Sequence, residues 1–248
     1  MLTWSSDAAT DTGTIRAGNE DAFIDLPARR LWGVADGAGG HDHGEVASGA
    51  LKAALELPVT ATDRVKVVRT LVAGVHDALL RRAAAEVTDH AVTIASTLVV
   101  LMADGPHYAC LWCGDSRAYL LRAGTLTQLT RDHSLVQELV DAGTLAAADM
   151  ERHPSANVLT RAIGAPGPAP EIDKITGRAE AGDCFLLCSD GLFKALDAGA
   201  ILSLLARTSP AAALIAAAIA AGARDNVTAV VVHALAEPAD GTVLRRVP

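Results

Sequence analysis

The chain has 248 residues, and 50% of them are hydrophobic, which suits one domain with a large core. Its 21 Lys and Arg against 29 Asp and Glu give a net charge of −8. Basic residues cluster only in pairs such as Arg29-Arg30, which argues against a general nucleic-acid surface, because phosphate backbones are bound by clustered Lys and Arg. The N-terminus lacks the features of a signal peptide, and the longest apolar run, residues 211–223, is too short to cross a bilayer, so we expect a cytoplasmic protein with no membrane association.

Short apolar segments bounded by turn residues predict the strands. We expect strands over residues 3–9, 22–26, 31–36, 96–103, 107–113, 117–122, 125–129, 171–178, 183–189 and 227–233. The four strands between residues 96 and 129 are separated by turns every eight or so residues, which is typical of one antiparallel meander.

Apolar residues at helical spacing predict the helices. We expect helices over residues 45–57, 62–86, 133–142, 197–206 and 209–222. Asp63 suits the first turn of the second helix, where the helix dipole favours a negative charge. Asp197 and Ser209 are the predicted N-caps of the last two helices, with Pro210 in the first helical position of the last one.

Residues 1–236 are expected to form a single domain, followed by a C-terminal tail over residues 237–248. The sequence has no internal repeat and no long linker. The segment from about residue 132 to 164 is polar and is interrupted by Pro154, so it predicts an excursion from the core. Residues 144–153 are expected to add one more turn of helix there.

Cys110 and Cys113 have the Cys-x-x-Cys spacing that can bind zinc or carry out redox chemistry. Both lie in one predicted strand, where residues three apart point to opposite faces, so a single ion could not easily reach both. Cys184 and Cys188 flank the apolar centre of another predicted strand. We interpret all four as buried structural thiols, with a metal or redox role as the alternative.

A carboxylate recurs at the end or start of an apolar strand, in all but one case directly beside Gly, Ser or Asn. The five residues that follow this pattern are Asp21, Asp36, Asp115, Asp190 and Asp225. Each alone is more often a turn residue. Together they are harder to dismiss, because the strands of a sheet bring such corners into one neighbourhood.

A cluster of these carboxylates would need protons or cations. Two carboxylates about 4 Å apart repel by roughly 4 kcal/mol at an effective dielectric of 20, and none of these motifs contains a lysine. Oxygen ligands without Cys or paired His favour Mg²⁺ or Mn²⁺ over zinc. Such a cluster with two ions can activate water for phosphoryl transfer, and the planar fork of Arg16 could grip two phosphate oxygens.

Five motifs resemble, in order, those of the metal-dependent type-2C serine/threonine protein phosphatases, and most closely those of the bacterial members. They are RAGNED (16–21), VADGAGGH (34–41), GDSRAY (114–119), SDGL (189–192) and DNVT (225–228). DHSL (132–135) and NVLTRAIG (157–164) are similar to the flap region of these enzymes. The resemblance covers nearly the whole chain. It implies an α+β fold, a four-layer α-β-β-α sandwich with two central antiparallel sheets and a flap subdomain over about 132–164.

The resemblance also implies a core site for two Mn²⁺ or Mg²⁺ ions. Asp36 would bridge both ions, and the carbonyl of Gly37 would complete the first site. Asp190 and Asp225 would hold the second ion, with Asp21 nearby, largely through water.

Asp115 would join Asp190 in a third, weaker metal site. Glu20, Asn226 and His41 are expected to support the metal ligands from behind rather than to bind the ions.

Arg16 would bind the substrate phosphate, and a hydroxide bridging the two ions would attack phosphorus directly, without a phosphoenzyme. Animal members carry a His directly after the Asp-Gly pair, thought to protonate the leaving group, whereas this chain has Ala38. A metal-bound water is therefore the proton donor we favour, with His41 as the alternative.

The expected function is hydrolysis of phosphoserine and phosphothreonine in proteins, reversing a serine/threonine kinase, by a monomeric enzyme. Two alternatives stay open. The chain could be a catalytically weak family member that acts as a binding or signalling module, or a phosphatase of small molecules. Neither the physiological substrate nor the kinase can be read from the sequence.

Overall fold

The computed structural model describes residues 2–39, 43–57, 63–86 and 92–237. His41 and the predicted tail from residue 238 onward lie outside the described residues. Within them, no helix is long and apolar enough to cross a membrane.

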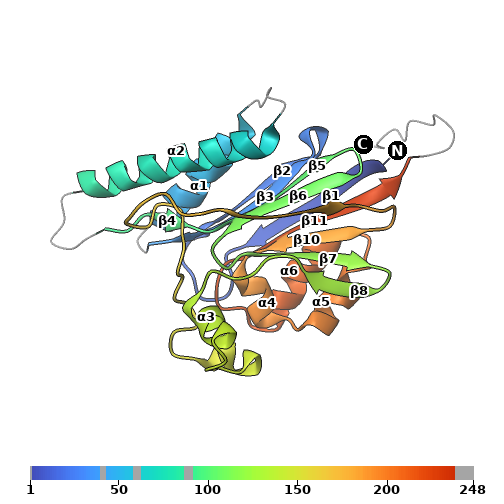
Figure 1. The fold of residues 1–248 in the computed structure, drawn as a ribbon. Coiled ribbons are helices and arrows are strands. Elements are labelled where there is room, and N and C mark those ends of the chain that lie inside the picture. The colour runs from blue at the N-terminus through green and yellow to red at the C-terminus, as the bar shows by residue number, and fades with distance from the viewer. Residues whose placement is uncertain (1, 40–42, 58–62, 87–91, 238–248) are drawn as a thin grey trace.

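Two antiparallel sheets form the centre of the molecule (Figure 1). The first sheet consists, in spatial order, of β1 (Leu2–Asp11), β11 (Val227–Ala236), β10 (Cys184–Cys188), β7 (Arg117–Arg122) and β8 (Thr125–Gln128). The second consists of β2 (Asp21–Leu26), β3 (Leu31–Ala38), β5 (Leu98–Asp104), β6 (His107–Cys113) and β9 (Asp173–Arg178), with the short β4 (Ala95–Ser96) paired to β3.

Helices cover the outer face of each sheet, as Figure 1 shows. The second sheet is covered by α1 (His43–Glu56) and α2 (Arg64–Ala85), and the first by α4 (Asp190–Ala195), α5 (Ala198–Leu205) and α6 (Pro210–Ala220). The predicted four-layer α-β-β-α arrangement is confirmed. The second helical layer contains α4, which the sequence analysis did not predict.

Three hydrophobic cores separate the four layers. Phe185 and Val230 lie between the two sheets, while their neighbours Leu186 and Val231 face the helices of the outer layer. Strands β10 and β11 are thus apolar on both faces, which explains their unbroken apolar sequences.

The four cysteines are free and buried. Cys110 lies between the sheets and Cys113 lies under α1 and α2, so the two face opposite sides of β6 as predicted.

The meander predicted between residues 96 and 129 is wrong, because its two halves belong to different sheets. β6 pairs with β9 in the second sheet, whereas β7 pairs with β10 in the first. The chain crosses between the sheets at Gly114, whose φ of +104° favours glycine and where a Cβ would lie 2.6 Å from the Thr97 side chain. This crossing places Asp115 where the two sheets meet.

Of the two predicted N-caps, one forms as expected and the other does not. Asp197 accepts a hydrogen bond from the Ala200 backbone nitrogen at 2.8 Å, as expected of an N-cap. Ser209 makes no side-chain cap, and Asp7 of β1 instead accepts from the backbone nitrogen of Ala211 at 2.9 Å. Asp63 is the N-cap of α2 rather than a residue of its first turn.

The excursion between the sheets contains α3 (Leu135–Asp141), capped by Ser134, and a 3-10 helix over Ala147–Arg152. It lies apart from the layered core in Figure 1. Its far end is tied back to α2, because Nδ1 of the buried His76 accepts a hydrogen bond from the Gly164 backbone nitrogen at 2.9 Å.

Candidate active site

One cleft of about 230 Å³ collects most of the predicted site residues. It is lined by Arg16, Glu20, Asp36, Gly37, Ala38, Gly39, Thr97, Asp115, Asn157, Leu159, Asp190 and Asp225. Four of the five predicted carboxylates are therefore neighbours, although they come from positions as distant in sequence as 36 and 225. The fifth, Asp21, lies directly beside Asp36.

Asp21 and Asp36 stand opposite each other on β2 and β3. Side chains at such directly opposed positions share one face of the sheet, and like charges there destabilise it. Asp21 Oδ2 accepts a hydrogen bond from Ser189 Oγ at 2.7 Å, while Asp21 Oδ1 is buried without a hydrogen-bond partner. Burial raises the pKa of Asp21 to about 7, and burial together with the charge of Asp21 holds the pKa of Asp36 well above its ordinary value.

Asp115 is also buried, and its backbone position is fixed by the crossing between the sheets. Burial and then the charge of Asp190 raise the pKa of Asp115 to about 7. Thr97 links this turn to β3, since its backbone nitrogen donates to the Asp36 carbonyl at 2.8 Å and its hydroxyl lies 2.7 Å from Ser116 Oγ. Thr97 was not among the predicted site residues, because in the sequence it looks like any other β-branched strand residue.

Gly37 allows α1 to approach the cleft. A Cβ at this position would lie 2.2 Å from the Gly44 carbonyl oxygen, so no larger residue fits without moving the helix. The Gly37 backbone nitrogen donates to the Glu20 carbonyl at 3.1 Å.

Asn226 holds the loop that carries Arg16. Its Oδ1 accepts from the Glu20 backbone nitrogen at 2.8 Å, and its Nδ2 donates to the carbonyls of Thr12 and Gly18 at 2.8 and 2.9 Å. With these three bonds, Asn226 joins the start of β11 to residues 12–20. It supports the cleft from behind and does not line it.

Two cationic side chains contact the carboxylates. Arg16 forms a two-pronged ion pair with Asp225, with both nitrogen–oxygen distances at 2.8 Å. Lys194 Nζ lies 2.5 Å from Asp190 Oδ2. Lys194 was not among the predicted site residues, because its contact depends on α4, an unpredicted helix whose turn brings positions 190 and 194 together.

The donors of the cleft suit a hard divalent cation. Asp36 is half-buried among other carboxylates that line the cleft, and Asp21 Oδ1 is buried without a hydrogen-bond partner, as expected of a group that binds a cation. All of these donors are oxygens, as Mg²⁺ and Mn²⁺ prefer. Among the described residues no three acidic, His or Cys side chains already converge on one point, and two of the carboxylates are instead paired with Arg16 and Lys194.

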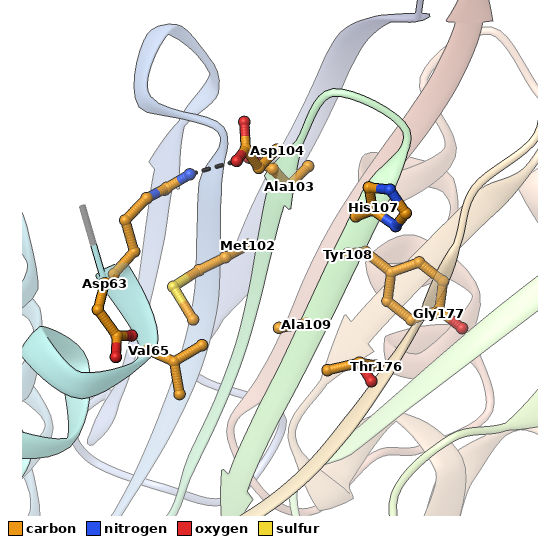
Figure 2. Close-up of a pocket in the computed structure, with 11 residues that line it drawn as sticks. Asp63, Val65, Met102, Ala103, Asp104, His107, Tyr108, Ala109, Thr176 and Gly177 are labelled. Carbon is orange, nitrogen blue, oxygen red and sulfur yellow. Dashed lines mark hydrogen bonds between the residues drawn. The ribbon is translucent and has the colours of Figure 1, made fainter.

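A larger cavity, of about 550 Å³, lies elsewhere, between the start of α2 and strands β5, β6 and β9 (Figure 2). Its walls are mostly apolar, with Met102 and Tyr108 among them. Of its charged residues, Asp63 caps α2 by accepting from the Lys66 backbone nitrogen at 3.0 Å, and Arg64 donates to the Ala103 carbonyl at 2.8 Å. We therefore place the chemistry in the smaller, carboxylate-lined cleft.

A family model described as protein phosphatase 2C matches residues 15–221. The chain belongs to the protein phosphatase 2C family. The matched range includes Arg16, Asp21, Asp36, Asp115 and Asp190 of the site.

Known members of the protein phosphatase 2C family are similar to this chain over most of its length. Serine/threonine protein phosphatase PstP of Mycobacterium tuberculosis is 36% identical over 230 residues, which are 90% of this chain and 44% of PstP. The structure of PppA from Pseudomonas aeruginosa shares 38% identity and a TM-score of 0.84, covering 94% of this chain and 98% of PppA. The PstP catalytic domain in complex with two manganese ions shares 33% identity and a TM-score of 0.84, covering 95% and 100%. The chain thus spans less than half of full-length PstP.

Proposed function

We propose that this chain is a metal-dependent phosphatase that hydrolyses phosphoserine and phosphothreonine in proteins and so reverses a serine/threonine kinase. The observation that carries the proposal is the gathering of Asp36, Asp115, Asp190 and Asp225 with Arg16 in one cleft. Membership of the protein phosphatase 2C family supports it. The manganese-bound PstP domain supports the choice of metal.

In this proposal Asp36, Asp190 and Asp225 hold two Mn²⁺ or Mg²⁺ ions, with help from the Gly37 carbonyl and Asp21. Bound there, the ions would supply Lewis acidity to the phosphate and would lower the pKa of a water molecule in the cleft. The protein supplies the negative charge that attracts the ions. Because Asp21 and Asp115 have pKa values of about 7, cation binding must displace protons from the cluster at neutral pH.

Arg16 is proposed to bind the substrate phosphate. Its guanidinium already makes a two-pronged contact with the Asp225 carboxylate, and the same fork matches two phosphate oxygens. If Asp225 held a cation, its ion pair with Arg16 would weaken, and Arg16 would be free to bind the incoming phosphate. The hydrogen bond and charge of Asp225 raise the pKa of Arg16, so the side chain stays charged throughout.

Arg16→Ala is expected to raise KM for a phosphothreonine peptide by about tenfold, equivalent to roughly 1.4 kcal/mol of binding, with a smaller fall in kcat. Arg16→Lys keeps the charge but loses the fork, so it should recover only part of the loss. Steady-state kinetics would measure this, with Arg207→Ala, an exposed arginine after α5, as the control. An unchanged KM and kcat in Arg16→Ala would remove Arg16 from the site.

The leaving alkoxide also needs a proton. Ala38 lines the cleft but carries no ionisable group, so we propose that water supplies this proton. A monomeric state, a partner kinase and a cytoplasmic location belong to the same proposal. The four free, buried thiols suit a reducing compartment.

The test is an assay with a phosphothreonine peptide and p-nitrophenyl phosphate, each with Mn²⁺, with Mg²⁺ or with EDTA. We expect both to be hydrolysed with a metal ion and neither with EDTA. Hydrolysis of the small ester alone would favour a small-molecule phosphatase. Inactivity with every metal would favour the binding or signalling module.

A further inference from the structure

Lys194 contacts two groups at the edge of the cleft. Its Nζ lies 2.5 Å from Asp190 Oδ2 and donates to Asn157 Oδ1 at 2.7 Å. Asp190 and Lys194 are four residues apart on α4, so one turn of helix places the ammonium over the carboxylate. Asn157 belongs to the excursion between the sheets, 37 residues earlier in the chain.

The first contact places a positive charge beside a pair of carboxylates. Asp115 and Asp190 both line the cleft. Burial and then the charge of Asp190 raise the pKa of Asp115, whereas the charge of Lys194 lowers it. The side chain of Lys194 is 27% exposed and that of Asp190 15%, so water screens their attraction only in part. This is the pair of carboxylates that the sequence analysis expected to hold a third metal ion.

The second contact reaches the wall of the cleft. Asn157 and Leu159 line the cleft, and Val158 between them is bonded to α3 through its carbonyl, which accepts from the Leu135 backbone nitrogen at 2.9 Å. A link from α4 to Asn157 therefore fixes the excursion at the point where it borders the carboxylates. A hydrogen bond from a charged donor is among the stronger contacts a surface segment can make.

We propose that Lys194 is a positioning residue that replaces a third metal ion between Asp190 and Asp115 and, through Asn157, holds the excursion against the cleft. The inference rests on the proposed function of the cleft. It limits the protein to two metal ions. It also predicts that Lys194 matters more for phosphopeptides than for a small ester, because a peptide is larger and would extend over Asn157 and Leu159 at the wall of the cleft.

The first test counts bound Mn²⁺ by equilibrium dialysis at millimolar metal, which needs no activity. Wild type should bind two ions, and Lys194→Met should bind a third because Asp190 and Asp115 lose their internal cation. Lys66→Met, an exposed lysine on α2, is the matched control and should bind two. An unchanged count of two in Lys194→Met, with its melting temperature retained, would overturn the proposal.

The second test compares two substrates. Lys194→Met should raise KM for a phosphothreonine peptide by about tenfold and change KM for p-nitrophenyl phosphate by less than about twofold, as expected for one lost charged hydrogen bond. Asn157→Ala should raise the peptide KM similarly while still binding two ions. Equal KM changes for both substrates would contradict the link to the excursion. Should wild type prove inactive with every metal, the proposed function would fail while the ion count still tests Lys194.

Discussion

Asp36→Asn is expected to lower kcat for a phosphothreonine peptide by at least about a thousandfold, equivalent to about 4 kcal/mol of lost transition-state stabilisation. Asp36 is half-buried, stands opposite Asp21, and lies near the charges of Asp190, Asp115 and Asp225. It is therefore the carboxylate closest to the centre of the proposed cation site. The amide keeps the shape of the side chain but removes its charge and one of its ligand oxygens.

The measurement is single-turnover hydrolysis with saturating Mn²⁺, together with Mn²⁺ binding by calorimetry. Asp77→Asn, on the exposed side of α2, is the matched control and should keep full activity and full metal affinity. Because Asp36→Asn removes a buried charge, the variant should fold at least as well as wild type without metal, so loss of structure would not explain inactivity. Full activity in Asp36→Asn would exclude the proposed two-metal site.

The carboxylates of the site could be predicted because each sits at a local boundary. A buried strand followed by Asp and Gly is visible in a few consecutive residues, as at Asp36-Gly37 and Asp190-Gly191. Their meeting in one cleft depends on which strands pair, and that information is spread over the whole chain. The resemblance to the type-2C family, rather than local pattern, supplied it.

The crossing at Gly114 shows where local pattern fails. Turns every eight residues predict a meander equally well whether or not the chain changes sheet. The sheet that each strand joins is set by its pairing with a distant strand: β6 pairs with β9, and β7 pairs with β10. The roles of Thr97 and Asn157 were hidden in the same way, since both act through contacts with residues far away in sequence.

Lys194 was missed for a different reason. Asp190-Gly191 after a strand reads as a turn, and Gly in the second position of a helix lowers the helical signal. Once Asp190 is known to begin α4, the spacing of four residues to Lys194 becomes a visible ion pair. The internal cation could then have been foreseen, but its contact with Asn157 could not.

The metal-free protein is expected to lose stability as pH rises from about 5 to about 8. Asp21 and Asp115 have pKa values of about 7 in the folded protein, against 3.8 ordinarily, and Asp36 is raised as well. Between a pH of 3.8 and a pH of about 7, Asp21 and Asp115 keep protons in the folded state that they have lost in the unfolded state. The free energy of unfolding therefore falls as pH rises. At about 1.4 kcal/mol per pKa unit, the loss should amount to a few kcal/mol, or about 5 to 10 °C in melting temperature.

Two histidines act in the opposite direction below about pH 6.5, because burial lowers the pKa of His133 and of His233. Their effect cancels when wild type is compared with Asp36→Asn, which retains both. The melting temperature of Asp36→Asn should exceed that of wild type by a margin that widens from about pH 5 to about pH 8. A constant margin would show that Asp36 does not bind a proton more readily in the folded state than in the unfolded state.

Manganese should reverse the loss, and more strongly at high pH, because cations and protons compete for the same carboxylates. At a metal concentration about 100 times its dissociation constant, each bound ion adds roughly 2.7 kcal/mol to the free energy of unfolding. Thermal melting with and without Mn²⁺ should therefore give a larger shift at about pH 8 than at about pH 5 for wild type, and a much smaller shift for Asp36→Asn. An equal shift in melting temperature in both proteins would place the bound metal away from Asp36. A shift confined to wild type would show that Asp36 is required to bind the stabilising cation.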